Sequence, residues 1–345
     1  MKMATRLAAY VFAALLVTVP VAAQSAKTLE IYFIDVEGGQ ATLFVTPAHE
    51  SLLVDTGWGG FESRDAKRIA AAAKLAGLTK IDYVVITHYH DDHVGGVPQL
   101  AALLPVGTFV DHGPLFEHCP TCVSGFNGYM KLLDEKKMKR LSVVAGDTLP
   151  IRGMKVRVVS SNGKVITKPL MPPAAANEFC AASEIRPNDV TENGKSVGIA
   201  VQFGKFRTAD LGDLTWDMER KLMCPNNLIG DVSLLIVSHH GWLQSSSPAY
   251  VSAVHPRAAI MDNGEMKGGS LPTLQIFNGM HDTDLWQVHR SEEGKDANAP
   301  EARIANLSGA VDQDQGNYLK VSAKLDGTFS IFNARTGKTA DYPAR

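Results

Sequence analysis

The sequence predicts an α/β protein in which two packed β-sheets are flanked by helices. Two observations predict this fold. Short strands that alternate apolar and polar residues open the chain, and alternating strand and helix patterns follow them. The chain has 345 residues, of which 45% are apolar, so it can bury a large core. No Ser/Gly linker or sharp composition shift divides it, and we therefore expect residues 24–345 to form a single domain.

The first 23 residues have the pattern of a secretory signal peptide. Lys2 and Arg6 precede the apolar run Leu7–Val19, and the small residues Val21-Ala22-Ala23 follow it. The apolar run is short for a membrane span. We therefore expect cleavage near Ala23, no stable membrane span after cleavage, and a secreted or periplasmic protein.

The charge balance disfavours a polyanionic partner. Without Lys2 and Arg6, 32 of the 34 basic residues remain against 36 acidic ones, which is a formal net charge of −4. Such a protein has no global attraction to nucleic acid or to an anionic membrane. We therefore expect a small molecule or a phosphodiester as the substrate, with nucleic acid not favoured. Nothing in the sequence indicates an oligomeric state.

Strands and helices alternate along the first half of the chain. Helical spacing is found over residues 63–76, 98–104 and 126–137. The turn Glu37-Gly38-Gly39 predicts a hairpin between the first two strands. Strand patterns cover residues 29–36, 40–46, 51–55, 81–86 and 107–110.

The second half continues this alternation after a long irregular segment. Residues 161–196 are rich in Pro and Ala and show little periodicity, which predicts a functional lid or a disordered loop. Helices are expected over 216–222 and 247–254. Strands are expected over 154–160, 197–203, 232–237, 258–261, 285–289, 318–323 and 328–332.

The segment His88-Tyr89-His90-Asp91-Asp92-His93 predicts a metal site. It follows the buried strand pattern 81–86 and precedes a helical pattern, and strand ends of this kind carry the chemistry of buried sheets. Imidazole nitrogen and carboxylate oxygen are ligands of zinc and its divalent neighbours. His88 and His90 point the same way and suit one ion. Asp92 and His93 lie where the chain turns and suit a second ion, about 3.5–4 Å away.

His88-x-His90-x-Asp92-His93 resembles the signature of the metallo-β-lactamase-fold superfamily. Three further segments resemble its other motifs in chain order: Leu52–Gly57, Phe206–Leu214 and Leu234–Gly241. The Gly-Asp-Leu and His-His-Gly forms resemble the branch that contains the ComEC nuclease domain and the phosphorylcholine esterases. The resemblance covers about residues 29–335.

The resemblance implies a four-layer αββα sandwich that holds two divalent metal ions. Zn²⁺ is the metal expected, with Mn²⁺ as the alternative. Asp92, His239 and Asp55 are the candidate catalytic residues, with Asp55 as a carboxylate that orients a ligand. The candidate metal ligands are His88, His90, Asp92, His93, His112, Asp213 and His240.

Some of these assignments keep an alternative. Asp213 is preferred to Asp210 as the bridging carboxylate because Gly212-Asp213-Leu214 fits the family form better. His240 is assigned to the second metal and His239 to the substrate or leaving group, and the reverse stays open. His112, at a strand end, is the candidate third ligand of the first metal, and a histidine that only hydrogen-bonds near the site is the alternative.

Two further features have structural interpretations. His289 ends a late strand and is interpreted as a structural histidine, with a substrate contact as the alternative. Cys119, Cys122, Cys180 and Cys224 give an even count in an exported chain, which favours structural disulfides over a redox pair or half a zinc site. Three pairings are open.

The expected chemistry is hydrolysis. Two divalent ions lower the pKa of a bridging water, so that hydroxide is available at neutral pH to attack phosphorus or a carbonyl carbon. Phosphodiester cleavage is the first hypothesis, on the resemblance. Carbonyl hydrolysis of a lactone or β-lactam is the second. A metal-binding protein without activity is the third, and the full ligand set disfavours it.

Overall fold

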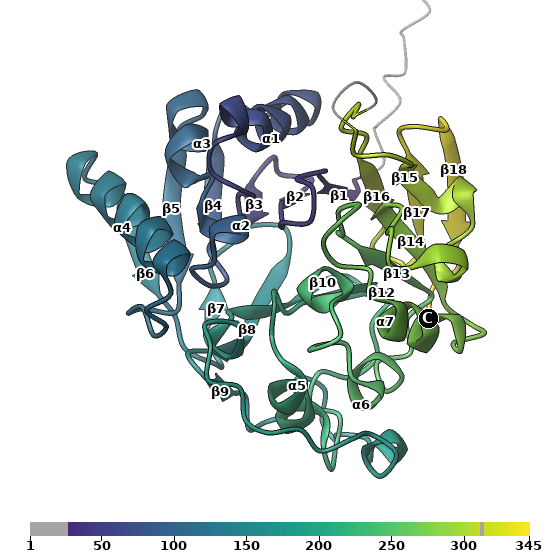
Figure 1. Ribbon diagram of the computed structural model, residues 1–345. Coiled ribbons are helices and arrows are strands. Elements are labelled where there is room, and N and C mark those ends of the chain that lie inside the picture. Colours follow the sequence, from purple (N-terminus) through teal and green to yellow (C-terminus); the bar gives the residue numbers. More distant parts are fainter. Residues whose placement is uncertain (1–26, 311–313) are drawn as a thin grey trace, which may run out of the picture.

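Two β-sheets pack face to face, and helices cover the outer face of each (Figure 1). The structure is a computed structural model that describes residues 27–310 and 314–345. The expected signal peptide, residues 1–23, lies outside the described residues. Within the described ranges, no helix is long and apolar enough to cross a membrane.

The first sheet contains the N-terminal strands together with the last three. Its strand order is β18-β17-β16-β1-β2-β3-β4-β5-β6 within the described residues. Strands β3, β4, β5 and β6 are parallel, and their neighbours are antiparallel. The strands are β1 (Leu29–Phe33), β2 (Thr42–Val45), β3 (Ser51–Val54), β4 (Ile81–Val85), β5 (Val106–Asp111), β6 (Lys139–Ser142), β16 (Leu319–Ala323), β17 (Phe329–Asn333) and β18 (Lys338–Tyr342).

The second sheet is built from the middle of the chain. Its order is β15-β14-β13-β12-β11-β10-β8-β7, and β9 pairs with β8. Strands β11 to β15 run parallel to one another, and β10 is antiparallel to β11. The strands are β7 (Thr148–Leu149), β8 (Lys155–Ser161), β9 (Lys164–Val165), β10 (Gly198–Phe203), β11 (Phe206–Asp210), β12 (Leu234–Ile236), β13 (Ala258–Met261), β14 (Asp284–His289) and β15 (Ile304–Asn306).

Two sets of helices cover the sheets (Figure 1). The first sheet carries α1 (Arg64–Leu75), α3 (Val97–Leu103) and α4 (Pro120–Glu135), and the second carries α5 (Trp216–Met223), α6 (Pro248–Val251) and α7 (Leu271–Asn278). The one-turn helix α2 (Asp91–Val94) follows β4. The 3₁₀ turns are η1 (Phe61–Ser63), η2 (Glu178–Cys180), η3 (Asn193–Lys195), η4 (Ser238–Gly241), η5 (Lys295–Ala297) and η6 (Glu301–Arg303).

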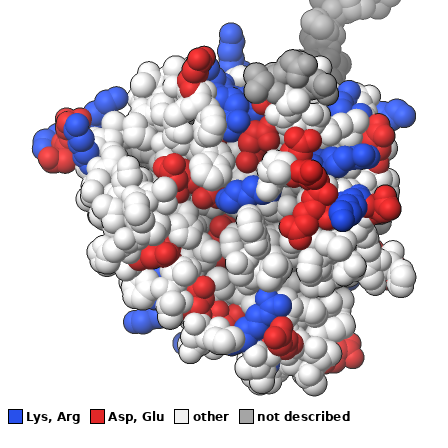
Figure 2. All heavy atoms as spheres, viewed as in Figure 1, with Lys and Arg blue, Asp and Glu red and all other residues white. Residues whose placement is uncertain are grey.

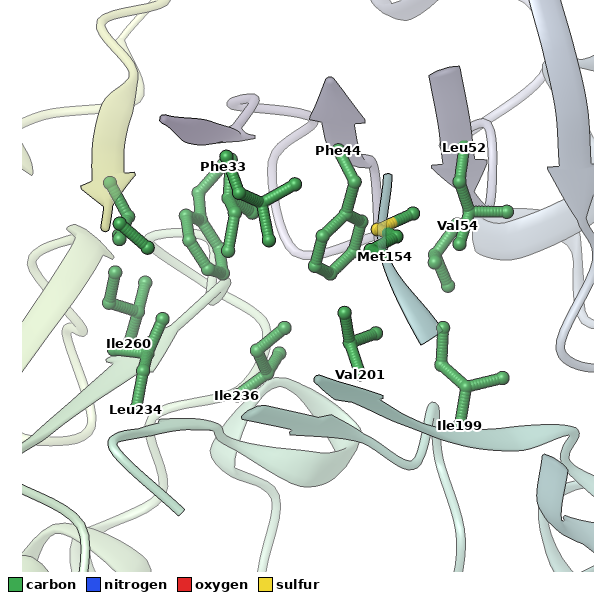
Figure 3. Close-up of a cluster of buried hydrophobic side chains, with 14 of the residues drawn as sticks. Phe33, Phe44, Leu52, Val54, Met154, Ile199, Val201, Leu234, Ile236 and Ile260 are labelled. Carbon is green, nitrogen blue, oxygen red and sulfur yellow. The ribbon is translucent and has the colours of Figure 1, made fainter. Parts of the chain in front are cut away.

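The core lies between the sheets, with an apolar layer under each set of helices. Figure 3 shows Phe33 and Phe44 of the first sheet pointing toward Val201 and Ile236 of the second. Each fully buried aliphatic or aromatic side chain contributes about 1.5–3 kcal/mol relative to exposure. The predicted four-layer αββα sandwich is therefore confirmed. Sequence patterns missed the short strands β6, β7, β9, β15 and β18 and the helix α7.

The topology gathers the polar strand ends at one edge of the sandwich. Strands β3, β4 and β5 are parallel in one sheet, and β11 to β14 are parallel in the other. Asp55 follows β3, His88 to His93 follow β4, and Asp213 follows β11. Carboxyl ends of parallel strands meet at one edge, which is where ligands bind in sheets of this kind.

Candidate metal centre

Two groups of donor side chains meet at this edge and share one carboxylate. Asp92, His93, Asp213 and His240 form one group, all buried, with ligand atoms within 4.8 Å of one another. His88, His90 and Asp213 form the other by the same measure. A carboxylate has two oxygens and can bond two ions. The arrangement therefore suits a pair of cations with Asp213 between them.

Hydrogen bonds fix the tautomer of His93 and His88. Asp55 Oδ2 accepts from His93 Nδ1 at 2.7 Å, so Nε2 of His93 carries a lone pair. Thr87 Oγ1 donates to Asp55 Oδ2 at 2.6 Å, and it can then accept from His88 Nδ1 at 3.0 Å. Nε2 of His88 is therefore also free to bind a metal. A carboxylate behind the ligand histidine is the usual support of such a site.

Carboxylates also lie behind His90 and His240. His90 Nε2 lies 3.3 Å from Glu117 Oε2, and His240 Nδ1 lies 3.4 Å from Asp262 Oδ1. The other nitrogen of each ring faces a partner histidine. His90 Nδ1 is 2.9 Å from His88 Nε2, and His240 Nε2 is 3.2 Å from His93 Nε2. When the rings are neutral, two lone pairs face each other in each pair, an arrangement that a cation between them would satisfy.

The carboxylates make the centre favourable for positive charge. Burial lowers the pKa of His93, but Asp213, Asp92 and Asp55 together raise it well above the usual value. Burial would raise the pKa of Asp213, yet its histidine neighbours hold it well below its usual range. Asp213 Oδ1 is buried without a hydrogen-bond donor among the described residues. The donor set, its charge and this orphaned oxygen all fit a divalent cation.

The His-His turn brings two adjacent histidines into the site. His239 and His240 have φ of 57° and 52°, and Gly241 follows at 76°. Residues other than glycine adopt this left-handed region at a cost of about 1–3 kcal/mol each, and they do so mainly where function requires it. The turn places His240 Nε2 3.2 Å from Asp92 Oδ2 and His239 Nε2 3.2 Å from Asp213 Oδ2. Both rings therefore face the centre.

The structure separates the two aspartates that competed as the bridge. Asp213 belongs to both donor groups. Asp210, at the end of β11, belongs to neither among the described residues, and it accepts from Gln40 Nε2 at 2.7 Å and from the Gly212 amide at 3.1 Å. Burial raises the pKa of Asp210 to about 7. Asp210 therefore stabilises the turn that precedes Asp213.

His112 is not brought together with the other candidate ligands. It follows β5, and its Nε2 lies 3.0 Å from Glu192 Oε2. Glu192 also accepts from the backbone amides of Phe116 and Glu117, at 2.6 and 3.1 Å. His112 and Glu192 thus hold the loop that carries Glu117 beside His90. The geometry favours the alternative interpretation, in which His112 only hydrogen-bonds near the site. The role of His112 as a metal ligand stays a prediction.

The segment 161–196, predicted as a lid or disordered loop, forms part of the wall of the site. Glu192 and Ser196 are fully buried. Asn193, in η3, places its Nδ2 3.4 Å from His239 Nε2. The segment packs against the site because buried polar side chains, rather than apolar periodicity, anchor it.

Sequence reasoning missed Lys267. Its Nζ contacts Asp92 Oδ2 and lies 5.1 Å from the ring centroid of Trp58. Burial raises the pKa of Asp92, but Lys267 and His93 outweigh it and hold that pKa well below the usual range. Lys267 lies between Gly264 and Gly268 in a loop without secondary structure. In the sequence, a lysine in this glycine-rich segment was the one feature that could have indicated its role.

Asp55 supports two ligand histidines, which gives a testable prediction. Asp55→Ala is expected to weaken metal binding and lower activity by roughly 10–100-fold, the usual cost of losing a carboxylate behind a ligand histidine. The loss frees the tautomers of His93 and His88. Competition with a chromophoric chelator measures metal affinity. Asp82→Ala is the control, because this carboxylate lies at the opposite end of the neighbouring strand β4. Equal affinities in wild type and Asp55→Ala would contradict the prediction.

His289 lies in an ionic cluster beside the site. Its Nε2 is 2.8 Å from Asp35 Oδ1 and 3.3 Å from Glu37 Oε1, and Arg68 Nη1 is 2.8 Å from Asp35 Oδ2. Burial lowers the pKa of His289, but the hydrogen bonds to Asp35 and Glu37 outweigh it and raise the pKa to about 9. These contacts are those of a structural histidine.

The raised pKa of His289 predicts a pH-dependent stability. Because the folded pKa of about 9 exceeds the unfolded value, the stabilisation is complete below about pH 6.5 and disappears as pH rises through 9. The shift corresponds to roughly 3 kcal/mol. Urea unfolding at pH 6 and pH 10 should show this loss in wild type and not in His289→Gln. His255 is exposed, so His255→Gln serves as the control. This variant should lose the same stability between pH 6 and pH 10 as wild type.

Both cysteine pairs form disulfides in the structure. The bridges are Cys119–Cys122 and Cys180–Cys224. The expected disulfides are therefore present, in one of the three open pairings, and the preference for structural bridges over a redox pair stays a prediction. Cys180–Cys224 ties the 161–196 segment to the end of α5.

Comparison with known proteins finds a family match for part of the chain. Residues 34–164 match the family model of the metallo-β-lactamase superfamily. The matched segment contains His88 to His93 and ends before Asp213. The resemblance to the superfamily is thus confirmed at the level of this domain, and the ComEC-like branch stays a prediction.

Two curated relatives match parts of the chain. Competence protein ComA of Neisseria gonorrhoeae is 23% identical over 245 residues, which are 70% of this chain and 28% of ComA. Atrochrysone carboxyl ACP thioesterase of Aspergillus terreus is 30% identical over 125 residues, 36% of this chain and 32% of the thioesterase. The chain therefore spans about a third of the length of these relatives.

A solved structure is also similar to part of the chain. PqqB of Methylobacterium extorquens is 14% identical, with a TM-score of 0.41, over 68% of this chain and 89% of PqqB.

Proposed function

We propose that this protein is an exported metal-dependent hydrolase with two divalent cations, and that its substrate is a small phosphodiester or a related ester. The observation that carries the proposal is the pair of donor groups that share Asp213. A single metal site would need no shared carboxylate. Two cations held a few ångströms apart are typical of hydrolases of phosphate esters.

The donor chemistry suits zinc, with manganese as the alternative. His88, His90 and Asp213 would hold one ion, and Asp92, His93, His240 and Asp213 would hold the other. When bound, the two ions supply a hydroxide nucleophile at neutral pH and offset the charge that develops on the substrate oxygen. All described cysteines are bridged, so none of them is a free thiol nucleophile at this edge.

His239 and Asn193 are placed to bind the substrate or its leaving group. His239 Nδ1 lies 3.2 Å from Ser245 Oγ, so the ring orientation is held from behind. Its Nε2 faces Asp213 and Asn193. Asn193 Oδ1 is buried without a partner among the described residues, which leaves it free for a ligand hydroxyl or amide. Hydrogen-bond donors here would contact charge that develops on the substrate.

The walls of the site favour a small, partly apolar anion. Trp242 stacks on His239 with ring centroids 6.2 Å apart, and Trp58 lies beside Lys267. Aromatic walls bind an apolar substituent, and Lys267 attracts an anion. On the face shown in Figure 2, Lys and Arg side chains are interspersed with Asp and Glu rather than joined in a basic band. A short ester therefore suits the surface better than a long nucleic acid.

Carbonyl ester hydrolysis is the alternative function. The similarity to an acyl-carrier-protein thioesterase over 125 residues favours it. The same two cations could polarise a carbonyl oxygen.

Substrate assays of the metal-loaded protein test the proposal. We expect turnover of bis-p-nitrophenyl phosphate, and little turnover of nitrocefin, an acyl-homoserine lactone or an acyl thioester. Activity only on the carbonyl substrates would replace the proposal with the alternative. Two bound equivalents of metal without turnover of any substrate would indicate a metal-binding protein without hydrolase activity.

Lys267 gives a prediction about substrate charge. Lys267→Met should raise KM for the anionic bis-p-nitrophenyl phosphate roughly 10–100-fold, because a hydrogen bond to a charged group contributes about 1.5–3 kcal/mol. KM for the neutral phosphotriester diethyl p-nitrophenyl phosphate should change little. Elemental analysis checks that the variant keeps its metal, since Lys267 contacts Asp92. An equal rise for both substrates would exclude a role in anion binding.

A further inference from the structure

A further set of potential metal donors includes His90. His90, Glu117, Cys119 and Cys122 each offer one ligand atom, and these atoms lie within 4.8 Å of one another. The two sulfur atoms are joined in a disulfide. The cluster stands where the loop after β5 enters α4, whose first residue is Pro120.

The position of the Cys119–Cys122 disulfide favours its reduction. Cys119 is partly exposed and forms the N-cap of the 16-residue helix α4, while Cys122 is fully buried. The Cys122 amide donates to Cys119 Sγ at 3.0 Å. A helix N-terminus and a backbone N–H both stabilise a thiolate at Cys119, which makes it a good leaving group in thiol–disulfide exchange.

We propose that reduction of Cys119–Cys122 creates a thiolate metal site that shares His90 with the hydrolytic centre. An external dithiol breaks the S–S bond, is itself oxidised to a disulfide, and leaves two protein thiols. A divalent ion then displaces one proton from each thiol and binds both sulfurs, Glu117 and His90. Two thiolates at Cys-x-x-Cys spacing with an imidazole and a carboxylate make a four-donor set that suits zinc.

The two nitrogens of His90 face different sites. Nδ1 faces His88 at 2.9 Å, and Nε2 faces Glu117 at 3.3 Å. A neutral imidazole has one lone pair. When Nε2 binds the ion held by the thiolates, Nδ1 carries the proton and can no longer bind a cation beside His88. Reduction should therefore weaken the first hydrolytic site, a consequence that rests on the proposed function.

The other disulfide provides a matched control. Cys180 is partly exposed and is joined to Cys224 across 44 residues. Within residues 27–310 and 314–345, no group of potential metal donors includes either of them. Reduction of this bridge yields two thiols without a histidine or carboxylate positioned to complete a metal site.

Cobalt(II) binding tests the proposal directly. The full-length protein is loaded with cobalt before and after reduction with a phosphine, which is removed by gel filtration under anaerobic conditions before the metal is added. We expect the reduced protein to develop a thiolate-to-cobalt charge-transfer band in the near ultraviolet. The Cys180→Ser/Cys224→Ser variant should keep this band, and the Cys119→Ser/Cys122→Ser variant should lose it.

Glu117→Ala keeps both cysteines and tests the remaining donors. Glu117 also accepts from the Glu192 amide at 2.9 Å, so circular dichroism checks the fold of the variant. The change should weaken the new cobalt site roughly 10-fold or more. A reduced protein whose four thiols react with Ellman's reagent but which shows no charge-transfer band would overturn the proposal. A band that persists in Cys119→Ser/Cys122→Ser would do the same. Neither readout depends on hydrolase activity.

Discussion

Asp213→Asn is expected to lower turnover by more than about 100-fold and to reduce bound metal from two equivalents. About 100-fold is the upper end of what the loss of an outer hydrogen-bonding partner costs, and Asp213 is placed to bond both cations itself. The amide keeps the shape of the carboxylate but loses its charge and one acceptor oxygen. Steady-state kinetics and elemental analysis on the same preparation measure the two effects.

Asp210→Asn is the matched control for this prediction. Asp210 lies three residues earlier and is buried, but it contacts Gln40 and the Gly212 amide rather than the donor groups. We expect this variant to keep both metals and most of its activity. A larger loss in Asp210→Asn than in Asp213→Asn would reverse the assignment of the bridge.

Removal of the Cys180–Cys224 bridge is expected to cost about 4 kcal/mol of unfolding free energy. The bridge closes a loop across 44 residues, and restricting that loop in the unfolded chain accounts for this value. The Cys180→Ser/Cys224→Ser variant is compared with wild type by urea unfolding under oxidising conditions. The variant should also unfold at lower temperature.

The short bridge supplies the comparison. Cys119–Cys122 spans a sequence separation of only 3, so the same reasoning gives about 2 kcal/mol for Cys119→Ser/Cys122→Ser. The two variants should therefore differ by roughly 2 kcal/mol. If the short bridge proved the more costly to remove, loop entropy would not be the main source of the stabilisation.

The layers of the fold could be predicted because they follow from local pattern. Strands such as β4 and β12 are short apolar runs, and the polar residues directly after them had to lie at strand ends. The order of the motifs then placed Asp92 and Asp213 at one edge. Strands β6 and β18 were missed because they are largely exposed, so burial left no periodic signal in them.

The contacts around the ligands could not be predicted because they join distant segments. Lys267 meets Asp92 across 175 residues, and Glu192 meets His112 across 80. No spacing rule relates such pairs. His112 shows the limit clearly: its position at a strand end was predicted correctly, but its ring faces Glu192, which lies in a segment whose path the sequence did not indicate.

The left-handed turn at His239 and His240 links cation binding to folding. An unfolded chain rarely adopts that backbone conformation at two successive residues, because the left-handed conformation is energetically unfavourable for each of them. The surrounding sandwich holds the turn, and only then do both imidazoles face the aspartates. Denatured protein would therefore be a poor chelator, and each cation that binds would draw the population toward the native state.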